Sequence, residues 1–231
     1  MQDRYAGDVG DFGKLALLRE VSRGRRLGVC WYRCSGAGEN NNDGRHVDYL
    51  KRPERFRSLD PVAFDAMARV VAGERSLAAL EAAELLPGAR YHRDEVPRSR
   101  ALREEWFASV LAAMDGCDLV FADMDNGFEW SALSPKCIGR EEVRALRRRG
   151  RSLLLYHHQT RRAGGAPEEF RRFSDWLFEA GAQHVEAVRL RPYSSRFYLL
   201  VDGDRALSTA LGAFASRWGA ELVERFARIS R

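Results

Sequence analysis

Residues 117–127 read CDLVFADMDNG, and this stretch decides the predicted fold. A mostly apolar run at 118–122 that ends in turn-forming residues is typical of a buried strand in a parallel sheet. In open α/β sheets, ligands lie just beyond the carboxyl ends of such strands. Asp123, Asp125 and Asn126 are therefore candidate catalytic residues. The alternative interpretation is that residues 125–127 form only a turn, since Asn-Gly is a common turn former.

A second strand of the same kind is predicted at residues 152–156, where SLLLY leads into His157 and His158. Both histidines are candidate catalytic residues, because we expect their strand to lie beside the strand that ends at Asp123. Successive residues of a strand point to opposite faces, so only one histidine can face the two aspartates. A hydrogen-bonded structural role is the alternative for either of them.

The remaining chain predicts a single α/β domain over residues 1–231, with a mainly helical stretch at about 45–115. Residues 184–190 and 196–201 form an antiparallel hairpin in this prediction, and Arg196 at its mouth is expected at the surface. A last helix is expected from 206 to about 228. Further expected elements are helices at 15–21, 60–72, 76–85, 98–114, 131–149 and 167–179, and strands at 27–32, 46–50 and 89–92.

Composition excludes several classes of protein. An apolar content of 45% and a charged content of 31% are those of a globular chain. No apolar run approaches the ~20 residues of a membrane span, and the first residues lack the apolar core of a secretion signal. We therefore expect a cytoplasmic protein without a membrane partner. The four cysteines match no zinc-ligand spacing, so no structural metal is expected.

Positive charge points to a nucleic-acid partner. The 38 Lys and Arg residues outnumber the 33 Asp and Glu residues, which leaves a net charge of +5. Basic patches bind phosphate backbones, so RNA or DNA is a candidate partner. A solvated helix end is the alternative for the longest cluster. The basic clusters lie at 23–26, 51–57, 144–151 and 161–162.

Three motifs carry a resemblance to known proteins: GDVGDFGK at 7–14, DMDNG at 123–127 and YHH at 156–158. With them the chain resembles an uncharacterised bacterial family over most of its length. It is more distantly similar to class I S-adenosylmethionine-dependent rRNA adenine-N6 methyltransferases. That second resemblance implies a Rossmann-like, mostly parallel sheet that ends in an antiparallel hairpin.

The methyltransferase resemblance also implies roles for particular residues. Asp123 would accept a hydrogen bond from the amine to be methylated, and Asp125, Asn126, His157 or His158 would assist. At the corresponding place the enzymes have Asp-Pro-Pro-aromatic, so the chain departs from the pattern that recognises adenine. The residues implied at the cofactor S-adenosylmethionine are Asp8, Asp11, Lys14, Gly36 and Gly38.

Two other functions fit the same residues. Aspartate and histidine are ligands of Mg²⁺ and Mn²⁺, so a metal-dependent phosphoesterase or nuclease is one alternative to a methyltransferase. A non-catalytic binding module that keeps the fold is the other.

Overall fold

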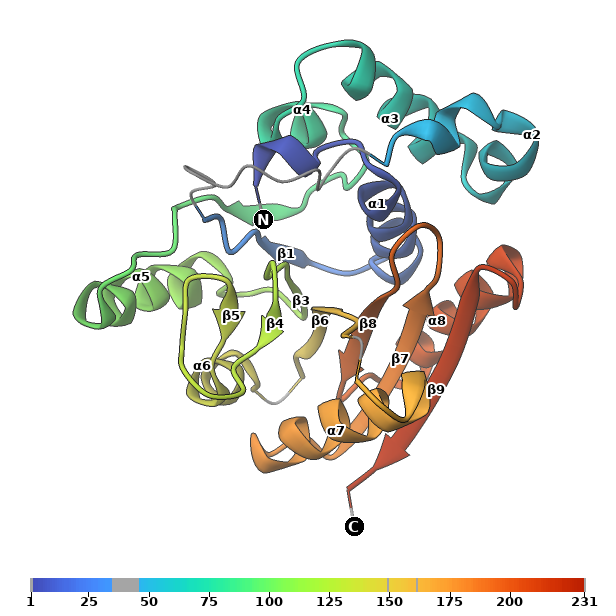
Figure 1. Cartoon of the computed structure of the whole chain (residues 1–231). Coiled ribbons are helices and arrows are strands. Elements are labelled where there is room, and N and C mark those ends of the chain that lie inside the picture. The colour runs from blue at the N-terminus through green and yellow to red at the C-terminus, as the bar shows by residue number, and fades with distance from the viewer. Residues whose placement is uncertain (1, 35–45, 149, 161, 231) are drawn as a thin grey trace.

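The computed structural model describes residues 2–34, 46–148, 150–160 and 162–230. A central seven-stranded sheet lies between two layers of helices (Figure 1). Across the sheet the strands are β2 (Arg90–His92), β1 (Leu27–Cys30), β3 (Leu119–Ala122), β6 (Ser152–His158), β8 (Arg196–Val201), β7 (His184–Leu190) and β9 (Val223–Ile229). A separate two-stranded sheet pairs β4 (Gly127–Phe128) with β5 (Cys137–Ile138).

Strand directions divide the sheet into a parallel and an antiparallel part. β2, β1, β3 and β6 pair in parallel, whereas β8 is antiparallel to β6 and to β7, and β9 is antiparallel to β7. Five strands therefore run one way, and β8 and β9 run the other. This arrangement is a mixed α/β sheet of the general Rossmann-like kind, and the predicted hairpin is its β7–β8 pair.

Helices cover both faces because the central strands are apolar on both sides. Leu119 and Phe121 belong to one buried cluster and Val120 and Ala122 to the other, as the alternation of a strand requires. The first face packs against α1 (Val9–Val21), α3 (Pro61–Ala72), α4 (Leu77–Ala82) and α8 (Arg205–Trp218). The second packs against α5 (Arg100–Ala113), α6 (Arg140–Leu146) and α7 (Gly165–Glu179). Short helical turns are η1 (Asp3–Tyr5), η2 (Asp48–Lys51), α2 (Pro53–Phe56) and η3 (Arg57–Leu59).

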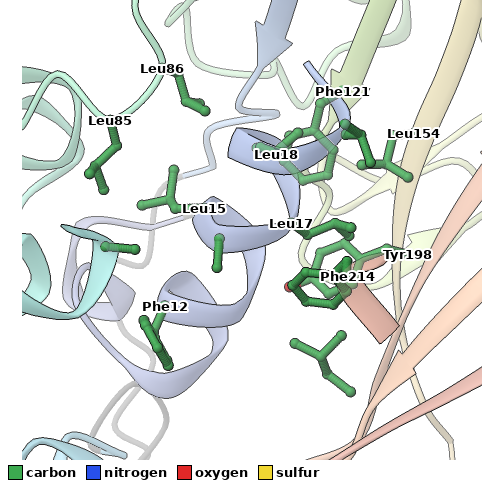
Figure 2. Packing of buried hydrophobic residues seen from close by; sticks show 14 of the residues in the cluster. Phe12, Leu15, Leu17, Leu18, Leu85, Leu86, Phe121, Leu154, Tyr198 and Phe214 are labelled. Carbon is green, nitrogen blue, oxygen red and sulfur yellow. The ribbon is translucent and has the colours of Figure 1, made fainter. Parts of the chain in front are cut away.

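Helix α1 is apolar around most of its circumference and lies in the middle of the first layer. Leu17 and Leu18 lie toward the sheet, beside Phe121, and Leu15 points toward Leu85 on the outer side (Figure 2). On a helix that is buried on all sides, a polar side chain is destabilising unless it has a hydrogen-bond or ion-pair partner. The polar residues near its amino end therefore need partners.

The C-terminal part of the chain departs from the prediction. The helix expected at 206–228 ends at Trp218, and Gly219 follows with a φ of +75°, a backbone conformation that favours glycine. Residues 223–229 then form β9 at the edge of the sheet, outside the hairpin. The sheet thus ends in β9 rather than in the hairpin. Residues 46–50 form no strand, because η2 occupies that part of the chain.

No helix among the described residues combines the length and the apolar character needed to cross a bilayer.

Candidate functional site

The candidate site lies where the order of the sheet reverses. From β1 the chain pairs outward to β2, and then returns to pair β3 on the other side of β1. The region beyond the carboxyl ends of β1 and β3 is therefore a topological switch point, the place where open α/β sheets bind their ligands. Asp123 stands there directly after β3, and its backbone N–H donates to the Cys30 carbonyl at 2.9 Å.

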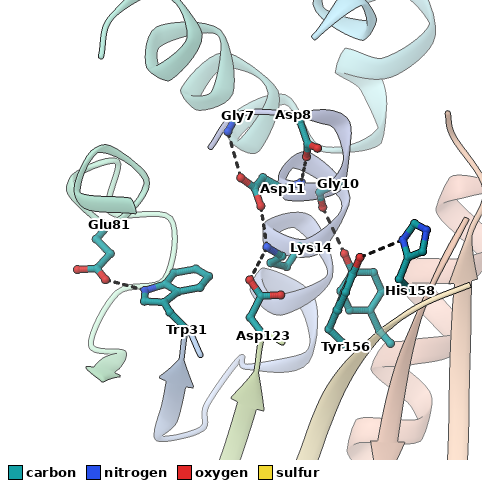
Figure 3. A network of polar contacts seen from close by, with 11 residues as sticks. Gly7, Asp8, Gly10, Asp11, Lys14, Trp31, Glu81, Asp123, Tyr156 and His158 are labelled. Atoms are coloured by element: carbon teal, nitrogen blue, oxygen red, sulfur yellow. Dashed lines mark hydrogen bonds and ion pairs between the residues drawn. The ribbon is translucent and has the colours of Figure 1, made fainter. Parts of the chain in front are cut away.

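A buried lysine joins two aspartates at this point. The Lys14 ammonium donates to Asp11 Oδ1 and to Asp123 Oδ2, both at 2.7 Å (Figure 3). The three side chains are between 2% and 5% exposed. The same ammonium lies 5.5 Å from the ring centre of Trp31, which follows β1. Lys14 therefore holds the Asp123 carboxylate in place from the face of the sheet that α1 covers.

The start of α1 explains why these side chains meet. Asp8 caps the helix, because its carboxylate accepts the Asp11 N–H at 2.9 Å. Asp11 and Lys14 are three residues apart and so share a helix face. Asp11 Oδ2 accepts the Gly7 N–H at 3.1 Å, and Gly7 has a φ of +82°. The motif at 7–14 is thus a helix start that holds one lysine against the sheet.

Burial and charge act against each other in this cluster. Burial raises the pKa of the Asp11 carboxyl, the Lys14 charge opposes that rise, and the net shift is upward. Burial lowers the pKa of Lys14, but the charges of Asp11 and Asp123 outweigh burial and hold it well above its ordinary value. Lys14 is therefore charged, and it balances only one of its two carboxylate neighbours.

Arg196 supplies a further positive charge and corrects an expectation. Predicted at the surface of the hairpin, it is only 5% exposed. A methyl group on Gly10 would lie 2.0 Å from Arg196 Nη1, so the guanidinium packs against the backbone of α1. Burial lowers the pKa of Arg196, yet the charge of Asp8 and the neighbouring Tyr156 raise it above its ordinary value. Sequence alone gave no signal for this contact, because residues 10 and 196 meet only in the folded sheet.

Asp125 and Asn126 lie beyond the lysine cluster. Asp125 is half-buried, and its Oδ2 accepts hydrogen bonds from Gln2 Nε2 at 2.9 Å and from Cys34 Sγ at 3.2 Å. Burial raises the pKa of the Cys34 thiol to about 11, so this donor is protonated at neutral pH. Asn126 is exposed, and its backbone N–H donates to the Lys136 carbonyl. The two residues therefore extend the site toward Gln2 and Cys34.

The two histidines point to opposite faces, as their positions in a strand predict. His157 is 1% exposed and stacks on Phe173 of α7, with ring centres 4.0 Å apart. Its Nδ1 is 2.7 Å from the His158 carbonyl and must donate, so Nε2 is the acceptor for Trp130 Nε1 at 3.4 Å. Burial is the largest cause that lowers the pKa of His157, to about 3. His157 is thus a neutral core residue on the face away from Lys14.

His158 is exposed and lies on the same face as the lysine cluster. Its Nδ1 is 3.5 Å from the hydroxyl of Tyr156, which packs against the α1 side of the core. Tyr198, on the neighbouring strand β8, donates to the Gly10 carbonyl at 3.3 Å. Of the two histidines, only His158 therefore remains a candidate for contact with a ligand at the Asp123 edge.

Metal ligation is not favoured by this geometry. Among the residues that the structure describes, no group of three or more His, Cys, Asp or Glu side chains is placed to hold an ion. Asp11 and Asp123, the two carboxylates of the lysine cluster, already share the ammonium of Lys14. The lysine thus occupies the position that a bridging cation would take. The predicted cofactor residues Gly36 and Gly38 lie outside the described residues.

Glu129, two residues after the DMDNG motif, lines a groove of about 1130 Å³. Trp130 is 40% exposed on it. Arg103 holds its wall, since it donates to both oxygens of the buried Glu142 at 2.7 and 2.9 Å and to the Ser134 carbonyl at 2.8 Å. The Glu142 carboxylate also accepts from Tyr32, which follows β1 with a φ of +41°. One buried network therefore ties the end of β1 to this groove.

The chain matches no protein-family model and no curated protein sequence.

Proposed function

We propose that this protein is an S-adenosylmethionine-dependent methyltransferase that acts on an amine of a nucleic acid or of another substrate. The observation that carries the proposal is the Asp123 carboxylate, which is fixed by Lys14 beyond β3 at the switch point of the sheet. The insertion of β8, reversed, between β6 and β7 supports it, because the methyltransferase resemblance implies such a hairpin.

Asp123 is the residue suited to orient the acceptor amine. An ionised carboxylate can only accept hydrogen bonds, so it binds an amine through N–H and leaves the nitrogen lone pair pointing away. Lys14 holds this carboxylate in one position through a hydrogen bond of 2.7 Å. Positioning of this kind, together with exclusion of water, can lower a barrier by several kcal/mol. Bound S-adenosylmethionine would supply the electrophilic methyl group.

The described residues fit the cofactor in part. Glu95 follows β2 and forms a parallel backbone bridge with Arg33, which follows β1, so an acidic residue stands at the edge where a ribose would bind. Lys14, in contrast, is engaged by two carboxylates, so we assign it to the support of Asp123 and not to the cofactor. Glu95 carries no local sequence signal for this role, because the pairing of β2 with β1 is a tertiary contact.

The groove at Glu129 favours a large substrate over a small amine. Its volume of about 1130 Å³ exceeds the ~300–1,000 Å³ typical of small-molecule pockets. Its lining carries charges of both signs beside the exposed Trp130: the basic residues Arg98, Arg100 and Arg140, and the acidic residues Glu104, Glu129 and Glu141. Arginine and an aromatic ring are the residue types that bind phosphates and stack on unpaired bases. RNA or DNA is therefore the substrate that we propose.

Calorimetric titration with S-adenosylmethionine tests the proposal, followed by transfer of a labelled methyl group to RNA and to DNA. Asp123→Asn should retain cofactor binding and lose most of the transfer, because an amide is a weaker acceptor than a carboxylate. Asp65→Asn, an exposed aspartate that pairs with Arg57, is the matched control and should behave as the wild type. Folded wild-type protein that shows no saturable cofactor binding would refute the proposal, and a parallel Mn²⁺ titration would then test the hydrolase alternative.

A further inference from the structure

A pocket of about 400 Å³ lies at the edge of the sheet opposite to Asp123. Ser152, the first residue of β6, lines it together with Asp202, which follows the antiparallel strand β8. These positions mark the amino end of β6, whereas Asp123 follows the carboxyl end of β3. The pocket is therefore separate from the candidate methyltransferase site, and its function does not depend on that proposal.

Arginine dominates the lining of this pocket, and its two carboxylates have structural partners. Asp202 Oδ1 accepts the backbone N–H groups of Gln183 and His184 at 2.8 and 3.1 Å. Asp204 caps α8 by accepting the Leu207 N–H at 2.9 Å. Each carboxylate also pairs with one arginine of the pocket: Asp202 Oδ2 accepts from Arg147 Nε at 2.9 Å, and Asp204 accepts from Arg25 at 2.7 Å. Three arginines of the described lining therefore have no carboxylate partner within the pocket, and the start of α8 directs its positive dipole end toward this region. The arginines that line the pocket are Arg25, Arg144, Arg147, Arg148 and Arg151.

Arg151 is a buried cation whose guanidinium binds only carbonyls. It is 6% exposed, and it donates to the carbonyls of Cys117 and Leu146 at 3.1 Å and of Met114 at 2.6 Å. In the described part of the chain it forms no ion pair. Burial lowers its pKa, and the charge of Arg148 lowers it further. A cation of this kind is costly unless an anion approaches it.

Two arginines at the rim are free to change partners. Arg144 and Arg148 are 46% and 45% exposed, and they pair with the exposed carboxylates of Glu141 and Asp115. Exposed ion pairs contribute little to stability, so a ligand can replace them at small cost. The pocket thus offers a buried cation at its base and two exchangeable guanidinium groups at its mouth.

We propose that this pocket binds a ligand that carries two or more phosphate groups. Guanidinium groups bind phosphate oxygens through paired, charge-assisted hydrogen bonds. The volume of about 400 Å³ falls within the range of pockets that hold a nucleotide and exceeds the need of a single phosphate ion. The same chemistry is offered by a free phosphorylated compound and by the backbone of a nucleic acid.

Calorimetry at low ionic strength tests the proposal with tripolyphosphate, ATP and a short single-stranded oligonucleotide as probes. The principal variant is Arg144→Gln combined with Arg148→Gln, because both side chains are exposed and the fold should tolerate their change. Loss of two charged contacts should weaken tripolyphosphate binding about tenfold or more. Arg171→Gln is the matched control, since Arg171 is an exposed arginine paired with Glu168 on α7.

The outcomes separate the sources of the phosphate. Binding of tripolyphosphate and ATP without competition by the oligonucleotide indicates a free phosphorylated ligand. A nucleic-acid backbone is indicated if the oligonucleotide competes with tripolyphosphate and if the double variant binds both of these probes more weakly than the wild type. Arg151→Met, where it folds, should also abolish binding. Absence of saturable binding to every probe, or an equal loss in Arg171→Gln, would overturn the proposal.

Discussion

Replacement of Lys14 by Met tests the buried cluster most directly. The methionine side chain is about as long as that of lysine but carries no charge, so the change removes the cation and leaves Asp11 and Asp123 buried. Both carboxylates accept from Lys14 at 2.7 Å, and neither side chain is more than 4% exposed. Breaking a buried ion pair by removal of one partner costs about 3–5 kcal/mol.

Protonation sets an upper limit to this cost. A buried carboxylate without its cation can take up a proton, which costs about 1.36 kcal/mol for each pH unit above the ordinary pKa of 3.8. At pH 7 the limit is about 4.4 kcal/mol for a carboxyl with that ordinary pKa, and at pH 5 it is about 1.6 kcal/mol. Two carboxyls lose their cation, so the limit doubles to about 9 kcal/mol at pH 7 and about 3 kcal/mol at pH 5. We therefore expect Lys14→Met to lose about 4 kcal/mol of unfolding free energy at pH 7, the cost of a broken buried pair, and no more than about 3 kcal/mol at pH 5.

The sign of the pH effect follows from burial, which favours the protonated form of a carboxyl that has lost its cation. A group whose pKa is higher in the folded state stabilises the fold below its ordinary pKa, and that stability is lost as the pH rises. Urea denaturation at pH 5 and pH 7 measures the difference. Lys51→Met is the control, because Lys51 and Asp48 form an exposed pair, and it should leave the midpoint unchanged. A loss below about 1 kcal/mol at pH 7, or an equal loss at both pH values, would refute the reasoning.

Three further substitutions test neighbouring features. His157→Phe should remove a pH dependence of the free energy of unfolding. In the wild type the pKa of His157 is lowered from 6.5 to about 3, so the protein should lose about 2 kcal/mol of unfolding free energy between pH 8 and pH 5 through this group. Urea denaturation of both proteins at both pH values measures the difference. Gly127→Ala should lose about 3 kcal/mol of unfolding free energy, because its φ is +86° and a methyl group would lie 2.4 Å from His157 Cδ2. Gly24→Ala is the control: its φ is +71° but the methyl group would enter open space, so it should lose only about 1 kcal/mol in the same thermal scan. Arg103→Met should lose about 3–5 kcal/mol by leaving Glu142 buried without its cation, and the double variant with Glu142→Gln should recover part of that loss; a double-mutant cycle with additive losses would contradict the pairing.

Local signals in the sequence predicted much of the sheet. The strand at 118–122, the strand at 152–156 and the hairpin at 184–201 were predicted correctly, because each is an apolar run between turn formers. The edge strand β9 was read as helix because residues 223–229 mix apolar and charged residues, as an exposed helix also does. Their strand state depends on pairing with β7, which is a tertiary contact.

The candidate site was predictable in position but not in its contacts. The end of β3 marked Asp123 as a candidate functional position, yet its pairing with Lys14 joins residues 109 positions apart in the chain. The burial of Arg196 likewise depends on the approach of Gly10 from the first helix. Contacts of this length follow from the assembled topology, and no local pattern encodes them.

The ion pair between Lys14 and Asp123 also constrains how the molecule folds. Helix α1 is made early in synthesis, but the carboxylate that accepts its buried ammonium arrives with β3, more than a hundred residues later. Until then, docking α1 fully against β1 would bury a lysine with only Asp11 to offset it. We therefore expect α1 to remain loosely docked on the ribosome and to become protected from amide exchange only when β3 joins the sheet. Formation of the buried ion pair and docking of α1 against the first strands are then a single step, and β6, β8 and α8 complete the core after it.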